Sequence, residues 1–244
     1  MKNSYIYFFI ILIILIAVLF ITINGSSESV YKSKSSSKPD LRKATFAGGC
    51  FWCMEPPFEK LTGVSKVISG YTGGKKENPS YKEVATGSTD HAEAIEIHYD
   101  SSIISYNDLL EVLWRNIDPT DGGGQFVDRG KQYRPAIFYH DKDQKKLAKK
   151  SRNKLEKSKR FKNKIETKII KAIKFYAAEE YHQDFYKKST VRYKIYRMGS
   201  GRDPFLKKYW GDNLEYKVTK TSEKNNAESK RPLNIEFIKR SEKE

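Results

Sequence analysis

The sequence predicts an α/β or α+β domain over residues 43–213. Short stretches in which apolar and polar residues alternate, as they do in a β-strand, recur along this region. Between them lie stretches with the apolar spacing of a helix and a capping residue at the start. Strands and helices mixed in this way form layers rather than a helix bundle, and no internal repeat is visible.

The chain begins with an apolar segment. Residues 5–23 are apolar or aromatic throughout and carry no charge. A helix of this length, at ~1.5 Å per residue, nearly spans the ~30 Å hydrocarbon core of a bilayer. We therefore interpret residues 1–24 as a single transmembrane helix, either a membrane anchor or an uncleaved signal, because no good cleavage site follows. The domain is expected to be extracytoplasmic, although the lysines after the segment oppose that orientation.

The net charge of +16 raises the question of a nucleic-acid partner. Much of the positive charge lies in residues 142–168 and in the tail 214–244, and no groove-reading motif accompanies it. We therefore predict no nucleic-acid binding, a solvated helix face over residues 142–168 and a charged, flexible tail. Contact with anionic lipid head groups is the alternative for this charge. The Ser- and Lys-rich residues 25–42 are predicted to be a solvated tether.

The first half of the domain is predicted to alternate between helices and strands. Pro56 and Pro57 fit only the first turn of the first helix, because proline has no backbone N–H to donate. In order, the predicted elements are a helix that Glu59 to Ser65 complete, strands over residues 64–71 and 91–99, and a helix over residues 108–116 capped by Ser105 or Asn107.

The second half starts with a glycine-rich loop from Gly122 to about Arg134. A short apolar strand follows over residues 136–139. Asp141 then caps a lysine-rich helix that runs to about Lys159, with Leu147 and Leu155 on its inner face. A stretch rich in β-branched residues predicts a last strand over residues 165–175.

Cys50 and Cys53 are the only two cysteines of the chain. Cys50 is expected near a helix N-terminus, where a thiol pKa can fall to roughly 3.5 to 7.5, so it is a candidate nucleophile. Cys53 lies on the same helical face, and the pair could form a disulfide if the first turn relaxes. Two buried, inert thiols are the alternative. With four histidines and no second ligand pair at zinc-finger spacing, we expect no metal site.

The stretch Gly48-Gly49-Cys50-Phe51-Trp52, followed by Glu55, resembles the signature of the A-type peptide methionine sulfoxide reductases. The resemblance covers roughly residues 43–211. It implies a two-layer α/β sandwich with a mixed sheet. It also implies that the protein reduces methionine S-sulfoxide, in proteins and as the free amino acid, with no bound cofactor.

The resemblance implies a role for eight residues. Cys50 attacks the sulfoxide sulfur, and Glu93 is the acid, because alanines flank it on a strand that would face a poorly solvated pocket. Cys53 condenses with the resulting sulfenic acid, since the tail holds no cysteine. The remaining roles are hydrogen bonds to the sulfoxide oxygen from Tyr81 and Tyr133, an orienting carboxylate at Asp128, and a methyl site walled by Phe51 and Trp52.

The expected partners follow from this chemistry. They are oxidised proteins or peptides carrying methionine sulfoxide, the membrane through residues 5–23, and thioredoxin or an extracytoplasmic thioredoxin-like protein as the external dithiol. Two alternatives stay open at this point. One is a general Cys-x-x-Cys thiol-disulfide oxidoreductase. The other is a non-catalytic basic protein of the membrane surface.

Overall fold

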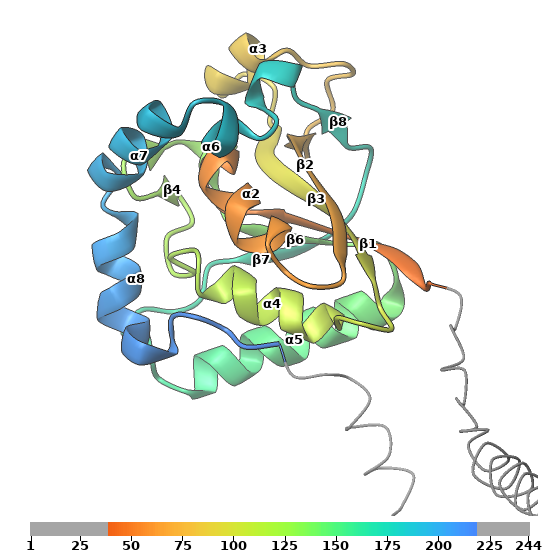
Figure 1. Ribbon diagram of the computed structural model, residues 1–244, viewed down its shortest axis with the longest axis vertical. Coiled ribbons are helices and arrows are strands. Elements are labelled where there is room, and N and C mark those ends of the chain that lie inside the picture. The colour runs from red at the N-terminus through yellow and green to blue at the C-terminus, as the bar shows by residue number, and fades with distance from the viewer. Residues whose placement is uncertain (1–38, 219–244) are drawn as a thin grey trace, which may run out of the picture. The chain divides into compact units, whose positions relative to one another are not determined.

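A computed structural model describes residues 39–218, which are built around a six-stranded mixed sheet (Figure 1). The strands follow the order β7-β6-β1-β3-β2-β8. Only the β6–β7 pair is parallel, and every other neighbouring pair in this sheet is antiparallel. The bounds are β1 (Leu41–Ala47), β2 (Val64–Thr72), β3 (Ala92–Asp100), β6 (Ala136–Tyr139), β7 (Lys168–Lys171) and β8 (Tyr176–Ala177).

Three helices cover one face of this sheet (Figure 1). They are α2 (Phe51–Glu59), α4 (Tyr106–Trp114) and α5 (Lys142–Lys157). Phe46 of β1 and Ile95 and Ile97 of β3 point into this layer and are fully buried. The opposite face carries a smaller cluster built on Ala47, Ala92, Ala94, Ala136 and Phe138. The main hydrophobic core therefore lies between the sheet and these three helices.

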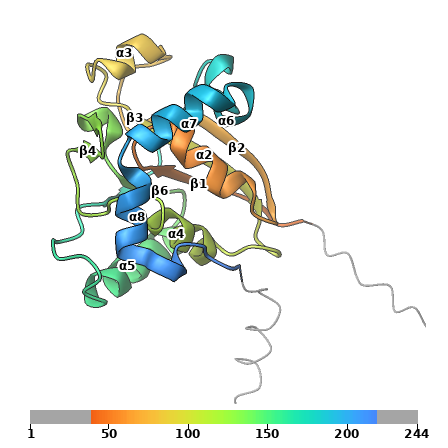
Figure 2. The same cartoon turned by 60° about the vertical axis from the view of Figure 1, so that its left-hand side comes forward.

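Several of the remaining short elements lie near the N-terminus of α2. Figure 2 shows α7 next to α2, which Arg197 of α7 contacts, and both figures show α8 following α7 along the edge of the domain. The bounds are α3 (Tyr81–Ala85), β4 (Gly124–Gln125), β5 (Asp128–Arg129), η1 (Lys131–Tyr133), η2 (Glu180–His182), α6 (Phe185–Lys188), α7 (Thr190–Gly199), α8 (Arg202–Trp210) and η3 (Gly211–Asn213).

Local sequence signals placed several elements correctly. The predicted strands over residues 64–71, 91–99 and 136–139 are confirmed as β2, β3 and β6, with ends within one residue. Ser105 rather than Asn107 caps α4, and it forms a capping box with Asp108. Asp141 caps α5 by accepting a hydrogen bond from the Gln144 backbone N–H at 2.7 Å. The last strand is shorter than predicted, because only Lys168–Lys171 pairs with β6.

The prediction that Pro56 and Pro57 lie in the first turn of a helix is wrong, because α2 begins at Phe51 and holds both prolines in its interior. A proline at position 57 leaves the Cys53 carbonyl without its donor four residues later. The Arg197 guanidinium of α7 takes that place and donates to the Cys53 carbonyl at 3.3 Å. Tertiary contact with α7 therefore compensates for one of the two missing helical hydrogen bonds.

The packed chain extends past residue 213. The Tyr216 hydroxyl donates to Asp108 Oδ1 at 2.7 Å, and the Arg115 guanidinium lies over the Tyr216 ring. Leu214 and Val218 also pack against the main core. Residues 214–218, which the sequence assigned to the flexible tail, therefore belong to the folded domain.

The expectation of a membrane-anchored, extracytoplasmic domain preceded by a transmembrane helix needs correction. Within residues 39–218, no helix has the length and apolarity that a membrane crossing requires. The helix expected at residues 5–23 lies outside the described residues. The described residues form the mixed-sheet α/β domain, and nothing in them supports membrane anchoring.

Candidate active site

Cys50 lies at the point where the chain turns from β1 into α2. It is the N-cap residue of α2, as the sequence predicted, and the backbone N–H of Cys53 donates to its carbonyl at 3.0 Å. Gly49 makes the turn with a φ of 85°, a conformation that favours glycine. The Cys50 residue is 7% exposed. Cys50 is thus almost completely buried.

The pKa of the Cys50 thiol differs from the sequence prediction. Burial, and then the nearby charges of Glu93 and Cys53, raise it well above its ordinary value, and a hydrogen bond with Tyr196 offsets only part of this. The helix N-terminus favours a thiolate, but desolvation outweighs it here. The predicted lowering of the pKa was therefore wrong, and the resting side chain is a neutral thiol.

The side chain of Glu93, on β3, reaches the N-terminus of α2. Its Oε2 accepts a hydrogen bond from the Phe51 backbone N–H at 3.0 Å, and the residue is 1% exposed. Burial raises the pKa of Glu93 to about 8 against the lowering effect of that N–H. The carboxyl is therefore protonated at neutral pH, as predicted from the flanking alanines, and can donate a proton beside Cys50.

Two tyrosines and an aspartate lie around this pair. Tyr81, at the start of α3, and Tyr133, at the end of η1, are both partly exposed. Burial and the charge of Glu93 raise the pKa of Tyr81 to about 12 and raise that of Tyr133 further, so both keep their hydroxyl proton. Burial also raises the pKa of Asp128, which accepts a hydrogen bond from the Tyr196 hydroxyl.

Phe51 and Trp52 begin α2 directly after Cys50. Phe51 is fully buried, with ring centroids 6.0 Å from Tyr71 and 5.0 Å from His182. Trp52 is partly exposed and stacks on Phe185 at 3.7 Å. Its indole Nε1 donates to His182 Nδ1 at 3.1 Å, which fixes the plane of the ring. The two aromatic side chains therefore have fixed positions, one inside the site and one at its edge.

Cys53 is fully buried in the first turn of α2 and is a free thiol, as is Cys50. A disulfide between residues three apart needs Cβ atoms about 3.5–4.5 Å apart. The hydrogen bond from the Cys53 N–H to the Cys50 carbonyl closes a tight turn between them. Because Cys50 has non-helical backbone angles, with φ −54° and ψ 122°, it can move without unwinding the rest of α2.

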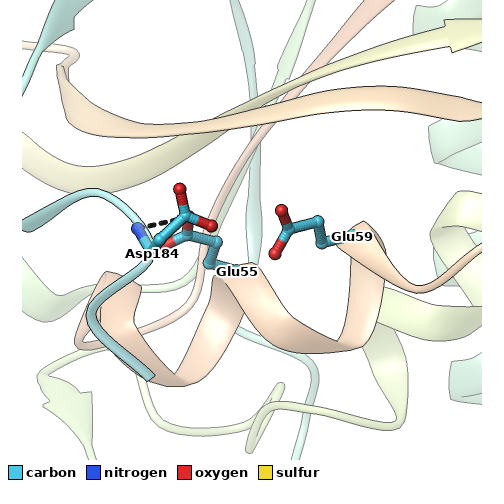
Figure 3. Close-up of side chains that lie close together, drawn as sticks. All are labelled: Glu55, Glu59 and Asp184. Atoms are coloured by element: carbon cyan, nitrogen blue, oxygen red, sulfur yellow. Dashed lines mark hydrogen bonds between the residues drawn. The ribbon is translucent and has the colours of Figure 1, made fainter. Parts of the chain in front are cut away.

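Three carboxylates lie on the other side of α2. Figure 3 shows Glu55 beside Asp184, with Glu59 one turn further along the helix. The Asp184 backbone N–H and the Ser69 hydroxyl donate to Glu55, at 2.9 and 3.1 Å. Lys187 forms ion pairs with both Glu59 and Asp184. Protein donors therefore satisfy these carboxylates, and Glu55 ties α2 to β2 and to the segment before α6.

The structure brings together Cys50, Glu93, Tyr81, Tyr133, Asp128, Phe51, Trp52 and Cys53. Sequence reasoning missed two further members. The Tyr196 hydroxyl of α7 donates to Asp128 near Cys50, and the ring centroid of His182 of η2 lies 4.3 Å from that of Tyr81. A signal for Tyr196 existed, because Tyr193, Tyr196 and Arg197 have the i, i+3, i+4 spacing of one helix face.

Comparison with known proteins gives relatives along the whole described domain. A model of the family described as peptide methionine sulfoxide reductase matches residues 42–214. A protein named peptide methionine sulfoxide reductase MsrA, from Listeria monocytogenes, is 56% identical over 174 residues, which are 71% of this chain and 98% of the relative. A Bacillus subtilis protein of the same name is 55% identical over 168 residues, 69% of this chain and 95% of the relative.

Solved structures agree with this relationship. The reduced form of Mxr1 from Saccharomyces cerevisiae is 34% identical, with a TM-score of 0.58, and the match covers 64% of this chain and 91% of that one. Methionine sulfoxide reductase A of Corynebacterium diphtheriae is 30% identical, with a TM-score of 0.56 and coverage of 64% and 78%. The chain belongs to the peptide methionine sulfoxide reductase family, of the type named MsrA.

Proposed function

We propose that this protein reduces methionine S-sulfoxide, in proteins and as the free amino acid, with Cys50 as the nucleophile and Glu93 as the proton donor. As a member of its family, the chain is a peptide-methionine (S)-S-oxide reductase. One observation supports the residue roles most directly. The buried, protonated Glu93 carboxyl is held by the Phe51 N–H, immediately after Cys50.

In the first step the Cys50 sulfur attacks the electrophilic sulfur of the sulfoxide. Glu93 protonates the sulfoxide oxygen and takes up the Cys50 thiol proton, so the net proton transfer is from the thiol to the oxygen. Tyr81 and Tyr133 donate hydrogen bonds to that oxygen. The protonated oxygen then moves to the Cys50 sulfur as the sulfur–sulfur bond of the adduct and the original S–O bond break, which leaves a sulfenic acid on Cys50 and releases the thioether as methionine. Phe51 and Trp52 hold the S-methyl group against their rings.

In the second step Cys53 attacks the Cys50 sulfenic acid. The S–O bond of Cys50 breaks, the Cys50–Cys53 disulfide forms, and the hydroxide leaves as water after it takes a proton from Glu93. Asp128 and the Tyr196 hydroxyl orient the Cys50 sulfur in both steps. No cofactor takes part, because both electrons come from the two thiols.

A dithiol must then reduce the disulfide before the next turnover. The proposed donor is thioredoxin or a protein with the same Cys-x-x-Cys chemistry. Its two thiols reduce the Cys50–Cys53 disulfide by thiol–disulfide exchange, so the donor becomes the disulfide and both enzyme thiols are free again. We assign the catalytic domain to residues 43–213, within the folded part of the chain, and treat residues 25–42 and the end of the tail as separate from catalysis.

The function is tested with a peptide that carries a single methionine sulfoxide, with the two sulfur epimers resolved. The full-length protein with dithiothreitol should reduce the S epimer and leave the R epimer unchanged. Cys50→Ser should abolish the reaction, whereas Cys53→Ser without reductant should still allow one reduction per enzyme molecule. Reduction of the R epimer, or unchanged activity of Cys50→Ser, would overturn the proposal. A protein that isomerised scrambled disulfides but left both epimers intact would be a general oxidoreductase.

A further inference from the structure

His182 of η2 accepts the single hydrogen bond that the Trp52 indole can donate. Trp52 Nε1 lies 3.1 Å from His182 Nδ1. The indole also stacks on Phe185, with ring centroids 3.7 Å apart and planes 8° apart, and it stands at 87° to the Tyr196 ring. Stacking holds the plane of a ring but allows it to slide or turn within that plane. The hydrogen bond to His182 therefore fixes the rotation of the indole in its plane.

The same hydrogen bond fixes the tautomer of His182. An indole N–H can only donate, so His182 Nδ1 is unprotonated and accepts, and a neutral ring then carries its proton on Nε2. Burial lowers the pKa of His182 against the raising effect of the Glu179 charge, which keeps the ring neutral at pH 7. The residue is 1% exposed, and within residues 39–218 its Nε2 has no hydrogen-bond partner. In this part of the chain, the imidazole thus bonds Trp52 alone.

Contacts on other sides hold His182 in place. The Gln183 side chain accepts a hydrogen bond from the Ser69 N–H of β2 and donates one to the Ser69 carbonyl, both at 2.9 Å. The imidazole centroid lies 5.0 Å from the ring centroid of Phe51 and 4.3 Å from that of Tyr81. The acceptor is therefore fixed to the sheet, independently of the indole that donates to it.

We propose that His182 is a positioning residue for substrate binding, which holds the Trp52 indole in the rotation that packs against the S-methyl group of the sulfoxide. This inference rests on the proposed function, since it takes Trp52 as a wall of the methyl site. Within the described residues His182 forms no hydrogen bond with Cys50 or Glu93, so the reacting groups keep their places without it. Loss of the histidine should therefore weaken substrate binding and leave the reaction rate of the bound complex unchanged.

Two substitutions separate the acceptor from the ring. His182→Phe keeps an aromatic ring but has no acceptor for the indole. His182→Asn loses the ring but carries an amide oxygen as many bonds from Cβ as Nδ1 is. Because a neutral hydrogen bond has a small net effect, the half-saturating peptide concentration should rise roughly two- to tenfold in His182→Phe, with a maximal rate within about twofold of the wild type. His182→Asn should lie closer to the wild type.

The experiment measures the first turnover of the full-length enzyme, without reductant, over a range of concentrations of a peptide that carries one methionine S-sulfoxide. The methionine burst gives the maximal rate and the half-saturating concentration. His98→Phe is the matched control, because His98 lies further along β3 than Glu93, bonds Glu96 and should leave both quantities unchanged. In a Trp52→Phe background, which lacks the indole N–H, His182→Phe should have no further effect.

Nuclear magnetic resonance reports the hydrogen bond itself. In protein with ¹⁵N-labelled tryptophan, the Trp52 indole N–H signal is identified by its loss in Trp52→Phe. This signal should move upfield in His182→Phe, as expected of an N–H that has lost its acceptor, and should stay near its wild-type position in His182→Asn. In protein with ¹⁵N-labelled histidine, wild-type His182 should carry its proton on Nε2 at pH 7.

The inference is overturned if wild-type His182 carries its proton on Nδ1, a result that needs no variant to fold. An unchanged half-saturating concentration in His182→Phe, or a lower maximal rate at unchanged half-saturation, would also overturn it. An equal effect of His182→Phe with and without the Trp52 indole would show that the histidine acts through packing instead. All of these results leave the proposed function intact, which fails only if the wild type forms no methionine from the S epimer.

Discussion

Glu93 combines three properties that a proton donor in this reaction needs. It is buried, its Oε2 is fixed by the Phe51 N–H at 3.0 Å, and its pKa is raised to about 8 by burial. An exposed strand glutamate would be ionised at neutral pH and could not protonate the sulfoxide oxygen. The fold makes the difference, since β3 places Glu93 opposite Tyr71 on the face that α2 covers.

The first step should lose rate as the pH rises through about 8, because Glu93 then gives up its proton. Single-turnover methionine release, measured between pH 6 and 10, should show this fall. Glu93→Gln should be slower by roughly 10²- to 10⁴-fold and should lack the fall near pH 8. Glu55→Gln is the matched control. Glu55 is a buried glutamate like Glu93, but it lies on α2 and accepts hydrogen bonds from Ser69 and Asp184 rather than from the Phe51 N–H beside Cys50. A Glu93→Gln enzyme with the same pH profile as the wild type would contradict this role.

The N-terminus of α2 depends on elements that are distant in the sequence. Gly49 allows the turn before Cys50, and it is packed between β4 and α8. A Cβ at Gly49 would lie 2.6 Å from the Gln125 Cβ and 2.8 Å from Arg202 Nη2. Its φ of 85° is also unfavourable for any residue with a side chain. The position of Cys50 thus rests on the lack of a side chain at one residue.

Gly49→Ala should therefore destabilise the protein by roughly 1–3 kcal/mol and slow the first step, because the turn must shift and carry Cys50 with it. Thermal unfolding and the methionine burst measure the two effects. Gly199→Ala is the control, since a Cβ there meets no atom within 4 Å among the described residues and Gly199 ends a helix. The idea fails if Gly49→Ala melts and reacts like the wild type.

At the level of elements, the sequence predicted those whose signal is local. The strands β2, β3 and β6 and the caps of α4 and α5 follow from alternation and from Ser105 and Asp141. The start of α2 was misjudged, because Pro56 and Pro57 argue against an interior position unless another element supplies the lost hydrogen bonds. Arg197 supplies one of them, from a helix that sequence reasoning did not identify.

At the level of the whole molecule, the candidate site forms from segments that are far apart along the chain. Cys50, Glu93, Asp128 and Tyr196 lie on four different elements and meet at one end of α2. The motif around Cys50 was enough to predict most of these residues through resemblance. The high pKa of Cys50 was not predictable, because it depends on burial by α7 and on the carboxyls that other elements bring beside it.

Much of the positive charge within the described residues lies on the exposed face of α5. The lysines of α5 line an exposed face, while Gln144, Ala148 and Leu155 are its buried residues. This agrees with the predicted solvated face.

The most direct measurement is peptide mass mapping of the enzyme after one turnover with the S epimer and no reductant. We expect one methionine released per enzyme molecule and a disulfide that joins Cys50 to Cys53. Cys53→Ser should release the same amount of methionine and retain a sulfenic acid at Cys50. Methionine released with both cysteines left as free thiols, or no methionine released at all, would contradict the account.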